Sequence, residues 1–383
     1  MKRPISVAAE VTWAQVHAFR VHRHHLSDAT PRAGVVTVAR DIGGAQAQVM
    51  SAAEMQIAVR SDATAAGVRH ALWGDRTLVK TWLMRGTLHL VPGDDLPLYT
   101  AAMQGDWIKT RNSWLTYLQI TEAQMTRLID RIGEAMDGTP MTRQEILERV
   151  GHGHSERVLE TLRSGWGGML KPVAGRGLLC FGPSRGQSVT FVNPRRWLAS
   201  WRTIDPHDAI TEIARRYLRA YGPATRNDFA RWWGTGSGAS RAAWSGLAPA
   251  LATVSAEGFH GDVLASDLQA LSGASIEDSV ALLPSFDPYL MGHTSRDHLM
   301  EKAHATKVSR TAGWISAVVL VDGRVEGTWT GQLSRSGLTI NVTPFRRLPA
   351  WATAEIRRRA RALAVAVGAP RAEVRIRPRA APS

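Results

Sequence analysis

An eight-residue segment occurs twice in the chain and constrains its fold more than any other feature. Thr139-Pro-Met-Thr-Arg-Gln-Glu-Ile146 aligns without gaps with Gly222-Pro-Ala-Thr-Arg-Asn-Asp-Phe229. In each copy the threonine can cap a helix, and the acid three residues later, Glu145 or Asp228, can bond back to the threonine amide. The repeat therefore predicts two helices that begin at equivalent places in an internally duplicated structure.

Each copy of the repeat follows a segment of helical periodicity. Apolar residues recur at helical spacing over residues 122–136 before the first copy and over residues 209–221 before the second. After the first copy, residues 154–169 are predicted to form a third helix. Residues 171–192 then fit a hairpin with its turn at Pro-Ser-Arg-Gly. The order helix, helix, helix, hairpin is that of a winged helix.

The chain has 383 residues, too many for one ordinary core, so several packed units are expected. We expect an N-terminal winged-helix-like unit at 1–115, a second winged helix with a basic hairpin at 116–200, a third helix-turn-helix unit at 201–262, and a β-rich C-terminal region with a terminal helix at 263–383. Within the last region, Asp322-Gly323 between alternating apolar residues predicts a hairpin turn. The Pro- and Arg-rich tail after Gly368 is expected to fray.

The chain carries a formal net charge of +14 and a sequence pI of about 10.8, with 41 arginines among its 47 basic residues. This excess indicates a polyanionic partner, and nucleic acid is the first candidate because arginine binds phosphate bidentately. In the second unit, the hairpin residues Lys171, Arg176 and Arg185 are expected to contact DNA. The simpler alternative is a solvated basic surface.

Other features exclude several classes of protein. No apolar run approaches the roughly 20 residues that cross a bilayer, and no signal peptide is recognised, so we expect a cytoplasmic protein with no membrane partner. The only cysteine, Cys180, can form no internal disulfide and is predicted to be a buried strand residue. Neither the phosphate-binding Gly-x-x-x-x-Gly-Lys nor the zinc-binding His-Glu-x-x-His pattern occurs, so we expect no cofactor and no metal.

The segment Gly-Gly-Ala-Gln-Ala-Gln at residues 43–48 is the local feature that could carry chemistry. Two glutamines two residues apart diverge on a helix but share one side of an extended segment, and the paired glycines favour a helix break. Gln46 and Gln48 could then face one cavity. A carboxamide is no general base, yet its donor and acceptor can position a water molecule and orient a sugar. A polar loop without chemistry is the alternative.

Two further segments follow these glutamines along the chain: Leu83-Met-Arg-Gly-Thr-Leu-His-Leu90 and Leu283-Pro-Ser-Phe-Asp-Pro-Tyr-Leu-Met-Gly292. In this order, the three segments make the chain resemble the AlkZ-type winged-helix DNA glycosylases of the AlkZ/YcaQ superfamily, and the resemblance covers most of the chain. It implies an α+β, mainly α fold of three tandem winged helix-turn-helix units in a C-shaped arrangement. The family motif is Gln-x-Gln; the YcaQ branch has aspartate where this chain has Gln48.

The resemblance implies a monofunctional glycosylase that removes N7- or N3-alkylated purines from double-stranded DNA. Bulky adducts or interstrand crosslinks of a genotoxic natural product are the expected substrates, in repair or self-resistance. An alkylated purine is cationic and leaves readily, so Gln46 and Gln48 need only place water and stabilise the oxocarbenium-like sugar. No lysine lies within the motif, and Lys80 is the nearest downstream, so no strand cutting is expected. A C-shaped clamp could act as a monomer.

The candidates for DNA contact outside the predicted hairpin are Arg85, Thr87, His89, Trp166 and Arg296. His89 could touch the lesion or serve a structural role, and core packing is the alternative for Trp166, as for each tryptophan. Arg296 could also pair with Asp287. Asp287 is expected to organise its turn by bonding to the backbone, and a catalytic role is the alternative.

Two alternatives without chemistry share these features. A winged-helix transcriptional regulator would use the same charge, helices and hairpins, but the chain length, the lack of a recognisable sensor domain and the glutamine motif argue against it. A resistance protein that only binds and shields damaged DNA is also compatible with the sequence.

Overall fold

The computed structural model describes residues 6–28, 33–103, 112–165 and 167–377. Among the described residues, helices hold 48% and strands 22%, which confirms the expectation of an α+β, mainly α protein. Within the described residues, no helix is both long and apolar enough to span a bilayer.

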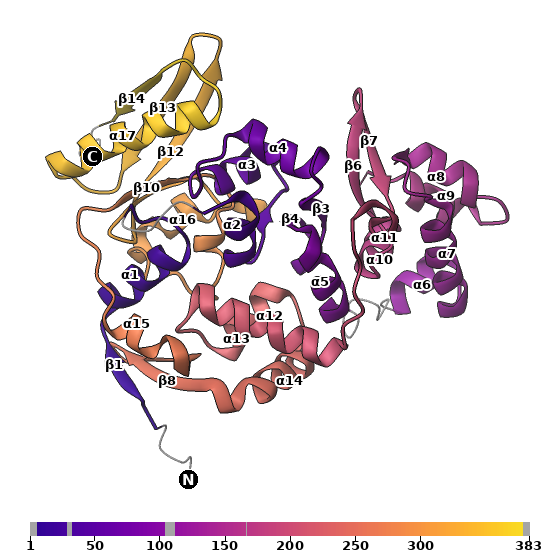
Figure 1. Cartoon of the computed structure of the whole chain (residues 1–383), viewed down its shortest axis with the longest axis horizontal. Coiled ribbons are helices and arrows are strands. Elements are labelled where there is room, and N and C mark those ends of the chain that lie inside the picture. The colour runs from indigo at the N-terminus through magenta and orange to yellow at the C-terminus, as the bar shows by residue number, and fades with distance from the viewer. Residues whose placement is uncertain (1–5, 29–32, 104–111, 166, 378–383) are drawn as a thin grey trace.

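The order helix, strand, helix, helix, hairpin occurs twice, and a third occurrence has a bridge in place of the first strand; we call these the first, second and third units (Figure 1). The first unit comprises α2 (Val35–Asp41), β2 (Ala45–Gln46), α3 (Met50–Ala58), α4 (Ala65–Trp73), β3 (Leu78–Trp82) and β4 (Leu88–Pro92). Its three strands are antiparallel, in the order β2-β4-β3. Helix α1 (Trp13–Arg23) precedes this unit and α5 (Leu96–Met103) follows it.

The second unit repeats the order and adds a short helix before the hairpin. Its elements are α7 (Glu122–Ala135), β5 (Met141–Thr142), α8 (Arg143–Val150), α9 (Glu156–Arg163), α10 (Leu170–Gly175), β6 (Cys180–Arg185) and β7 (Ser188–Val192), between α6 (Asn112–Leu118) and α11 (Pro194–Trp197). The sheet order is β5-β7-β6. Cys180 is fully buried in β6, as predicted.

Two expectations for the second unit are wrong. The third helix ends at Arg163 rather than continuing to residue 169, because the backbone of Ser164 is extended (φ −60°, ψ 127°). Farther on, Gly167 adopts a left-handed conformation (φ 71°) against the Trp82 ring, where a Cβ would lie 2.6 Å from Cζ2. The hairpin starts at residue 180 rather than 171. Lys171 therefore lies in α10 and Arg176 caps that helix, so only Arg185 of the three predicted basic residues is on the hairpin.

The third unit comprises α12 (Pro206–Tyr221), α13 (Arg226–Trp233), α14 (Ser237–Leu247), β8 (Leu251–Ala256) and β9 (Phe259–Leu264), followed by α15 (Leu268–Ser272). A bridge between Ala224 and Asp262 takes the place of its first strand. Strand β1 (Ala9–Val11) pairs in parallel with β8, so the start of the chain joins this sheet. The hairpin runs past residue 262, where we expected the unit to end.

The C-terminal region is built on a five-stranded sheet in the order β10-β11-β12-β13-β14. Its elements are β10 (Val280–Leu283), α16 (Ala305–Val308), β11 (Val318–Val321), β12 (Arg324–Ser334), β13 (Gly337–Pro344), α17 (Ala350–Ala366) and β14 (Ala372–Ile376). The predicted turn between β11 and β12 is confirmed: Asp322 and Gly323 have φ of 47° and 76°. The tail does not fray over residues 372–376, because β14 pairs in parallel with β13.

Both capping boxes predicted from the repeat are confirmed. Thr142 Oγ1 accepts the Glu145 amide at 3.3 Å, and Glu145 Oε2 accepts the Thr142 amide at 2.6 Å. The corresponding distances between Thr225 and Asp228 are 3.2 and 2.9 Å. Each pair satisfies two amides that the first turn of a helix would otherwise leave unbonded, so α8 and α13 begin where the repeat places them.

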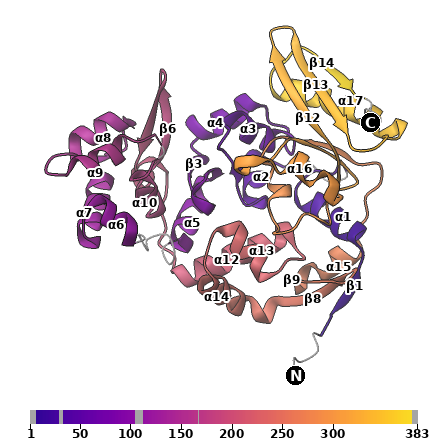
Figure 2. The same ribbon diagram turned by 180° about the vertical axis from the view of Figure 1, so that it is seen from behind.

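The first unit lies between the other parts of the molecule. Both views show the second unit on one side of it and the C-terminal sheet on the other (Figures 1 and 2). Helix α5 packs against α12 of the third unit, and Tyr99 and Tyr217 are buried in their shared core. Trp82 of β3 is 6% exposed and packs against Phe181 and Phe191 of the second unit, which confirms core packing for this tryptophan.

Candidate active site

Gln46 lies on the face of the first unit's sheet opposite its apolar core. Ala45 and Ala47 are fully buried in an apolar cluster. Because side chains alternate along an extended strand, Gln46 projects from the other face. Gln48 lies in the bend that follows Ala47 and is exposed, and its sharing of one face with Gln46 stays a prediction. Ala47 continues the pairing of β2 beyond its last residue, since its amide donates to the Leu88 carbonyl at 2.7 Å.

The double glycine before the motif turns the chain from α2 into β2. Gly43 and Gly44 have φ of 71° and 95°, which L side chains rarely adopt. A Cβ would lie 2.9 Å from the Trp232 ring at Gly43 and 2.9 Å from Val91 Cγ1 at Gly44. Both positions therefore require glycine, and the glutamines follow directly.

The two carboxamides have different surroundings. Gln46 is 6% exposed, and its Oε1 is buried without a hydrogen-bond partner among the described residues. Gln48 is exposed, and its Oε1 accepts the Leu88 amide at 3.3 Å, which leaves Nε2 as a donor. A buried acceptor without a hydrogen bond costs free energy, and a water molecule could donate the missing hydrogen bond to Gln46 Oε1. Gln48 could offer the same water a donor.

His89 lies directly across the ladder from Gln46. Its Nδ1–H donates to the Thr87 carbonyl at 3.0 Å, so Nε2 is the acceptor nitrogen. Burial, together with the nearby Arg85 cation, lowers the pKa of His89 to about 3. His89 is therefore a neutral acceptor at physiological pH, and it shares a sheet face with Gln46.

Gln56 of α3 holds the free edge of β2. The backbone groups of the residues on either side of Gln46 form their hydrogen bonds with β4. The Gln46 carbonyl therefore points to the unpaired edge of β2, where it accepts a hydrogen bond from Gln56 Nε2 at 3.2 Å. The same Nε2 donates to the Ser285 carbonyl at 3.2 Å. Gln56 is fully buried. It therefore fixes the Gln46 backbone from the side that the sheet leaves open.

A buried ion pair fastens α3 to the loop that contains Ser285. Arg60 donates to the two carboxylate oxygens of Asp287 at 2.6 and 2.9 Å, and neither side chain is exposed. Asp287 also accepts the Tyr289 amide at 3.0 Å, so it organises its turn as expected. The expected pairing of Asp287 with Arg296 is wrong, because Arg60 occupies both oxygens and Arg296 donates to Leu290 and Ser309.

A DNA glycosylase AlkZ-like family model matches residues 39–366. The chain belongs to the AlkZ-like DNA glycosylase family. An interstrand DNA cross-link repair glycosylase of Streptomyces sahachiroi is 36% identical over 379 residues, which are 96% of this chain and 100% of the relative. The solved structure of Streptomyces sahachiroi DNA glycosylase AlkZ matches with a TM-score of 0.86 and 36% identity, over 96% of this chain and 100% of that one. The family inferred from the sequence is thereby confirmed.

The remaining predicted contact residues of this AlkZ-like chain are spread over several elements. Arg85 and Thr87 lie in the turn between β3 and β4, beside the glutamines, and are half-buried. Arg176 is bound to Asp130 at 3.1 Å, and Arg185 is paired with Glu145, so each of these two arginines already has a carboxylate. Lys171 is half-buried. Trp166 lies outside the described residues.

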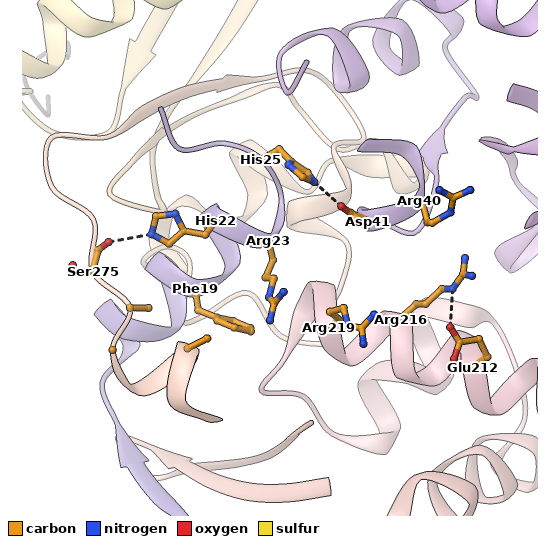
Figure 3. Close-up of a pocket in the computed structure, with 13 residues that line it drawn as sticks. Phe19, His22, Arg23, His25, Arg40, Asp41, Glu212, Arg216, Arg219 and Ser275 are labelled. Carbon is orange, nitrogen blue, oxygen red and sulfur yellow. Dashed lines mark hydrogen bonds and ion pairs between the residues drawn. The ribbon is translucent and has the colours of Figure 1, made fainter. Parts of the chain in front are cut away.

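A pocket of about 710 Å³ lies between α1, α2, α12 and α15 (Figure 3). Neither glutamine lines it. Its His25 Nε2 lies 2.8 Å from Asp41 Oδ2, and its Arg216 Nε donates to Glu212 at 3.0 Å. Within the described residues, three of the four arginines that line it, all except Arg219, are paired with carboxylates of the protein, so the glutamine face of the first sheet is the better candidate for the AlkZ-like active site.

Sequence reasoning missed Gln56 and Arg60. One signal was available: Gln56 and Arg60 are spaced one helical turn apart within Met55-Gln-Ile-Ala-Val-Arg60, where apolar residues indicate a buried helix. Their partners in the C-terminal region, Ser285 and Asp287, lie more than 200 residues later in the chain. Such a long-range pairing leaves no local pattern to recognise.

Proposed function

We propose that this chain is a monofunctional glycosylase that hydrolyses the N-glycosidic bond of N7- or N3-alkylated purines in double-stranded DNA. Gln46 and Gln48 place the attacking water. The observation that carries this proposal is the buried Oε1 of Gln46, which has no hydrogen-bond partner among the residues that the structure describes, beside the exposed Gln48, in a member of a DNA glycosylase family. The basic composition supports DNA as the partner.

The reaction needs little from the protein. Alkylation at N7 or N3 makes the purine cationic, so the bond from C1′ breaks with its electron pair going to the base, which leaves neutral. The water oxygen bonds to C1′, and the proton it loses passes to solvent. In this scheme Gln46 Oε1 accepts one water hydrogen and Gln48 Nε2 donates to one lone pair, which leaves the other lone pair for attack. The Gln46 Oε1, as the negative end of its amide dipole, stabilises the positive sugar without a charged base.

Lys80 is poorly placed to form a covalent sugar intermediate. In the sheet register Lys80 lies opposite Leu90, and Leu90 lies opposite Ala45, so the three share the face that packs on the apolar cluster. Gln46 is on the other face. The product is therefore expected to be an abasic site in an uncut strand.

Bulky adducts and interstrand crosslinks are the substrate class we favour within this reaction. The Streptomyces sahachiroi relative, described as an interstrand DNA cross-link repair glycosylase, aligns over its whole length, which supports the same class here. The exposed Gln48 supports it too, because a site at the surface can act on a base that cannot be drawn into a closed pocket. We propose repair or self-resistance as the role, by a monomer.

The test is release of free base from duplex DNA that contains N7-alkylguanine or a crosslink through that atom. We expect the wild type to release the base, and Gln46→Ala and Gln48→Ala each to slow release roughly 10²-fold. Gln269→Ala, an exposed glutamine on α15, is the matched control and keeps full activity. Borohydride treatment during the reaction should trap no covalent complex. Unchanged release by both motif variants contradicts the site, and binding without release by the wild type favours a shielding protein or a regulator.

A further inference from the structure

Three arginines gather around α13 next to the candidate active site. Arg85 donates to the Trp232 carbonyl of this helix. Arg231 is the neighbouring residue and is exposed. At the other end of α13, Asp228 accepts the Thr294 amide at 2.8 Å, which brings the loop that carries Arg296 against the helix.

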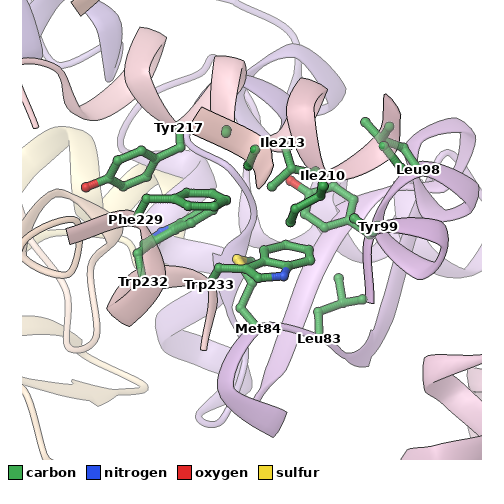
Figure 4. Packing of buried hydrophobic residues seen from close by; sticks show 14 of the residues in the cluster. Leu83, Met84, Leu98, Tyr99, Ile210, Ile213, Tyr217, Phe229, Trp232 and Trp233 are labelled. Atoms are coloured by element: carbon green, nitrogen blue, oxygen red, sulfur yellow. The ribbon is translucent and has the colours of Figure 1, made fainter. Parts of the chain in front are cut away.

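Packing fixes the turn that carries Arg85. Met84 and Leu83 lie against Trp232 and Trp233 of α13 in one apolar core (Figure 4). A Cβ at Gly234 would lie 2.9 Å from Arg85 Cα, so the approach of the two segments is close. The position of Arg85 beside Arg231 is therefore set by the core of the protein.

The three guanidinium groups are not neutralised by the protein. Within the described part of the chain, no carboxylate lies within ion-pair distance of Arg85, Arg231 or Arg296. Arg85 and Arg296 donate to carbonyl or hydroxyl oxygens instead. Asp228, on the same helix, is occupied by Thr225 and Thr294.

Burial and mutual repulsion make this arrangement costly without an anion. Burial, followed by the charge of Arg231, lowers the pKa of Arg296. Burial also lowers the pKa of Arg85 to about 10, and Arg231 contributes to that shift. Arg231 is therefore close enough to repel both other cations. Arg85 and Arg296 are half-buried, and Arg231 is exposed. Half-buried cations without a counter-ion are destabilising, and functional sites are where such groups occur.

A hollow beside Arg296 could accommodate a phosphate group. It has a volume of about 300 Å³ and is lined by Thr294, Ser295, Arg296, Lys302 and Ser309. Hydroxyl groups and guanidinium donors are the groups that bind phosphate oxygens. Asp297 also lines the hollow, but its side chain is 60% exposed and lies 3.9 Å from Lys302.

We propose that Arg85, Arg231 and Arg296 form a binding site for backbone phosphates of the DNA strand that carries the target nucleotide. Leu88, whose amide holds Gln48, is three residues from Arg85, so a strand bound to these arginines passes the glutamine pair. The site holds the strand in register while the glutamines act. This inference rests on the proposed function for its choice of DNA as the ligand.

The test measures binding without chemistry. The ligand is a duplex with one tetrahydrofuran abasic-site analogue, and its dissociation constant is measured from about 50 to about 200 mM salt. We expect Arg231→Gln and Arg296→Gln each to reduce the slope of log affinity against log salt by about one, so that affinity falls about fourfold less over this range. Arg375→Gln is the control, because Arg375 is exposed and paired with Glu373.

Neutral methylphosphonate linkages locate the phosphate. Where a methylphosphonate replaces the phosphate that the site binds, we expect the DNA affinity of the wild type to fall. The same replacement should not lower the DNA affinity of Arg231→Gln any further. If both arginine variants keep the wild-type slope, or every linkage weakens wild type and variant equally, the proposal is overturned. An assay of base release by the wild type separates the two proposals. If the wild type releases base and the arginine variants keep the wild-type salt slope, only the phosphate site is contradicted. If the variants have a smaller slope and the wild type releases no base, only the glycosylase activity is contradicted.

Discussion

At the residue scale, the candidate site consists of neutral groups with opposite hydrogen-bonding roles. Gln46 presents a buried acceptor, Gln48 an exposed donor, and His89 a neutral acceptor across the ladder. The sequence predicted that both glutamines share one face, because the double glycine and the spacing of two are local signals. It could not predict that one is buried and the other exposed, since this depends on segments distant in sequence.

This composition makes the pH dependence of the reaction testable. Glutamine does not titrate, and the pKa of His89 is lowered to about 3, so no group at the site changes charge between about pH 5.5 and pH 8. We expect the single-turnover rate of base release to be constant over this range. A rate that falls with an inflection near pH 6.5 would show that His89 titrates in its ordinary range. His89→Gln, which keeps an acceptor, should leave the profile flat.

At the element scale, the sequence predicted what local signals determine. The capping boxes of α8 and α13 and the turn before β12 were predicted correctly, because each depends on residues within one turn. The third helix of the second unit was predicted too long: the chain becomes extended at Ser164, and Gly167 then packs on Trp82, which is far away in sequence. Strand β14 was missed for the same reason: its partner β13 is distant in sequence.

Helix α3 gives an element-scale prediction about the glutamine motif. Gln56→Met keeps the size of the side chain but leaves the Gln46 and Ser285 carbonyls without their donor. We expect the single-turnover rate to fall roughly 10-fold to 10²-fold, because Gln46 shifts, while DNA affinity is unchanged. Stability should fall by about 1–3 kcal/mol.

A matched variant separates positioning from stability. Asn193 is also buried, and its Nδ2 donates to the Gly133 carbonyl at 2.9 Å in the second unit. Asn193→Leu should lower the melting temperature by a similar amount with no loss of rate. If both variants lose rate in proportion to their loss of stability, Gln56 has only a structural role.

At the scale of the whole molecule, contacts between parts far apart in sequence place the glutamine face. The third unit buries Trp232 against the double glycine, and the C-terminal region reaches the motif through Gln56 and the Arg60 and Asp287 pair. The family resemblance predicted the overall fold and the motif, but these contacts between distant parts of the chain were not predictable from any single segment. They explain why the Leu283–Gly292 segment, far from the motif in sequence, belongs to the same site.

A further contact between distant parts of the chain, from α1 to the loop that carries His293 and His298, makes the stability of the molecule sensitive to acid. Arg20 of α1 is buried and donates to Nε2 of His293 and of His298, each at 2.8 Å. Both rings accept from a cation, so both are neutral. Burial, followed by the charge of Arg20, lowers the pKa of His293 to about 3 and also lowers that of His298. His17, beside them, has its pKa lowered to about 3 in the same way.

Because these histidines have a lower pKa in the folded protein than the ordinary 6.5, the unfolded chain binds more protons between about pH 3 and pH 6.5. Stability is therefore complete above pH 6.5 and declines as the pH falls through this window. We expect the free energy of unfolding, measured by denaturant titration, to be constant from pH 8 to pH 7 and to decrease from pH 6.5 to pH 5. His293→Gln keeps an acceptor for Arg20 but cannot be protonated, so its decrease should be smaller by about one proton in slope at pH 5. A variant with the wild-type slope would show that the acid sensitivity arises at other groups, since paired carboxylates such as Asp228 lose their contribution only at lower pH.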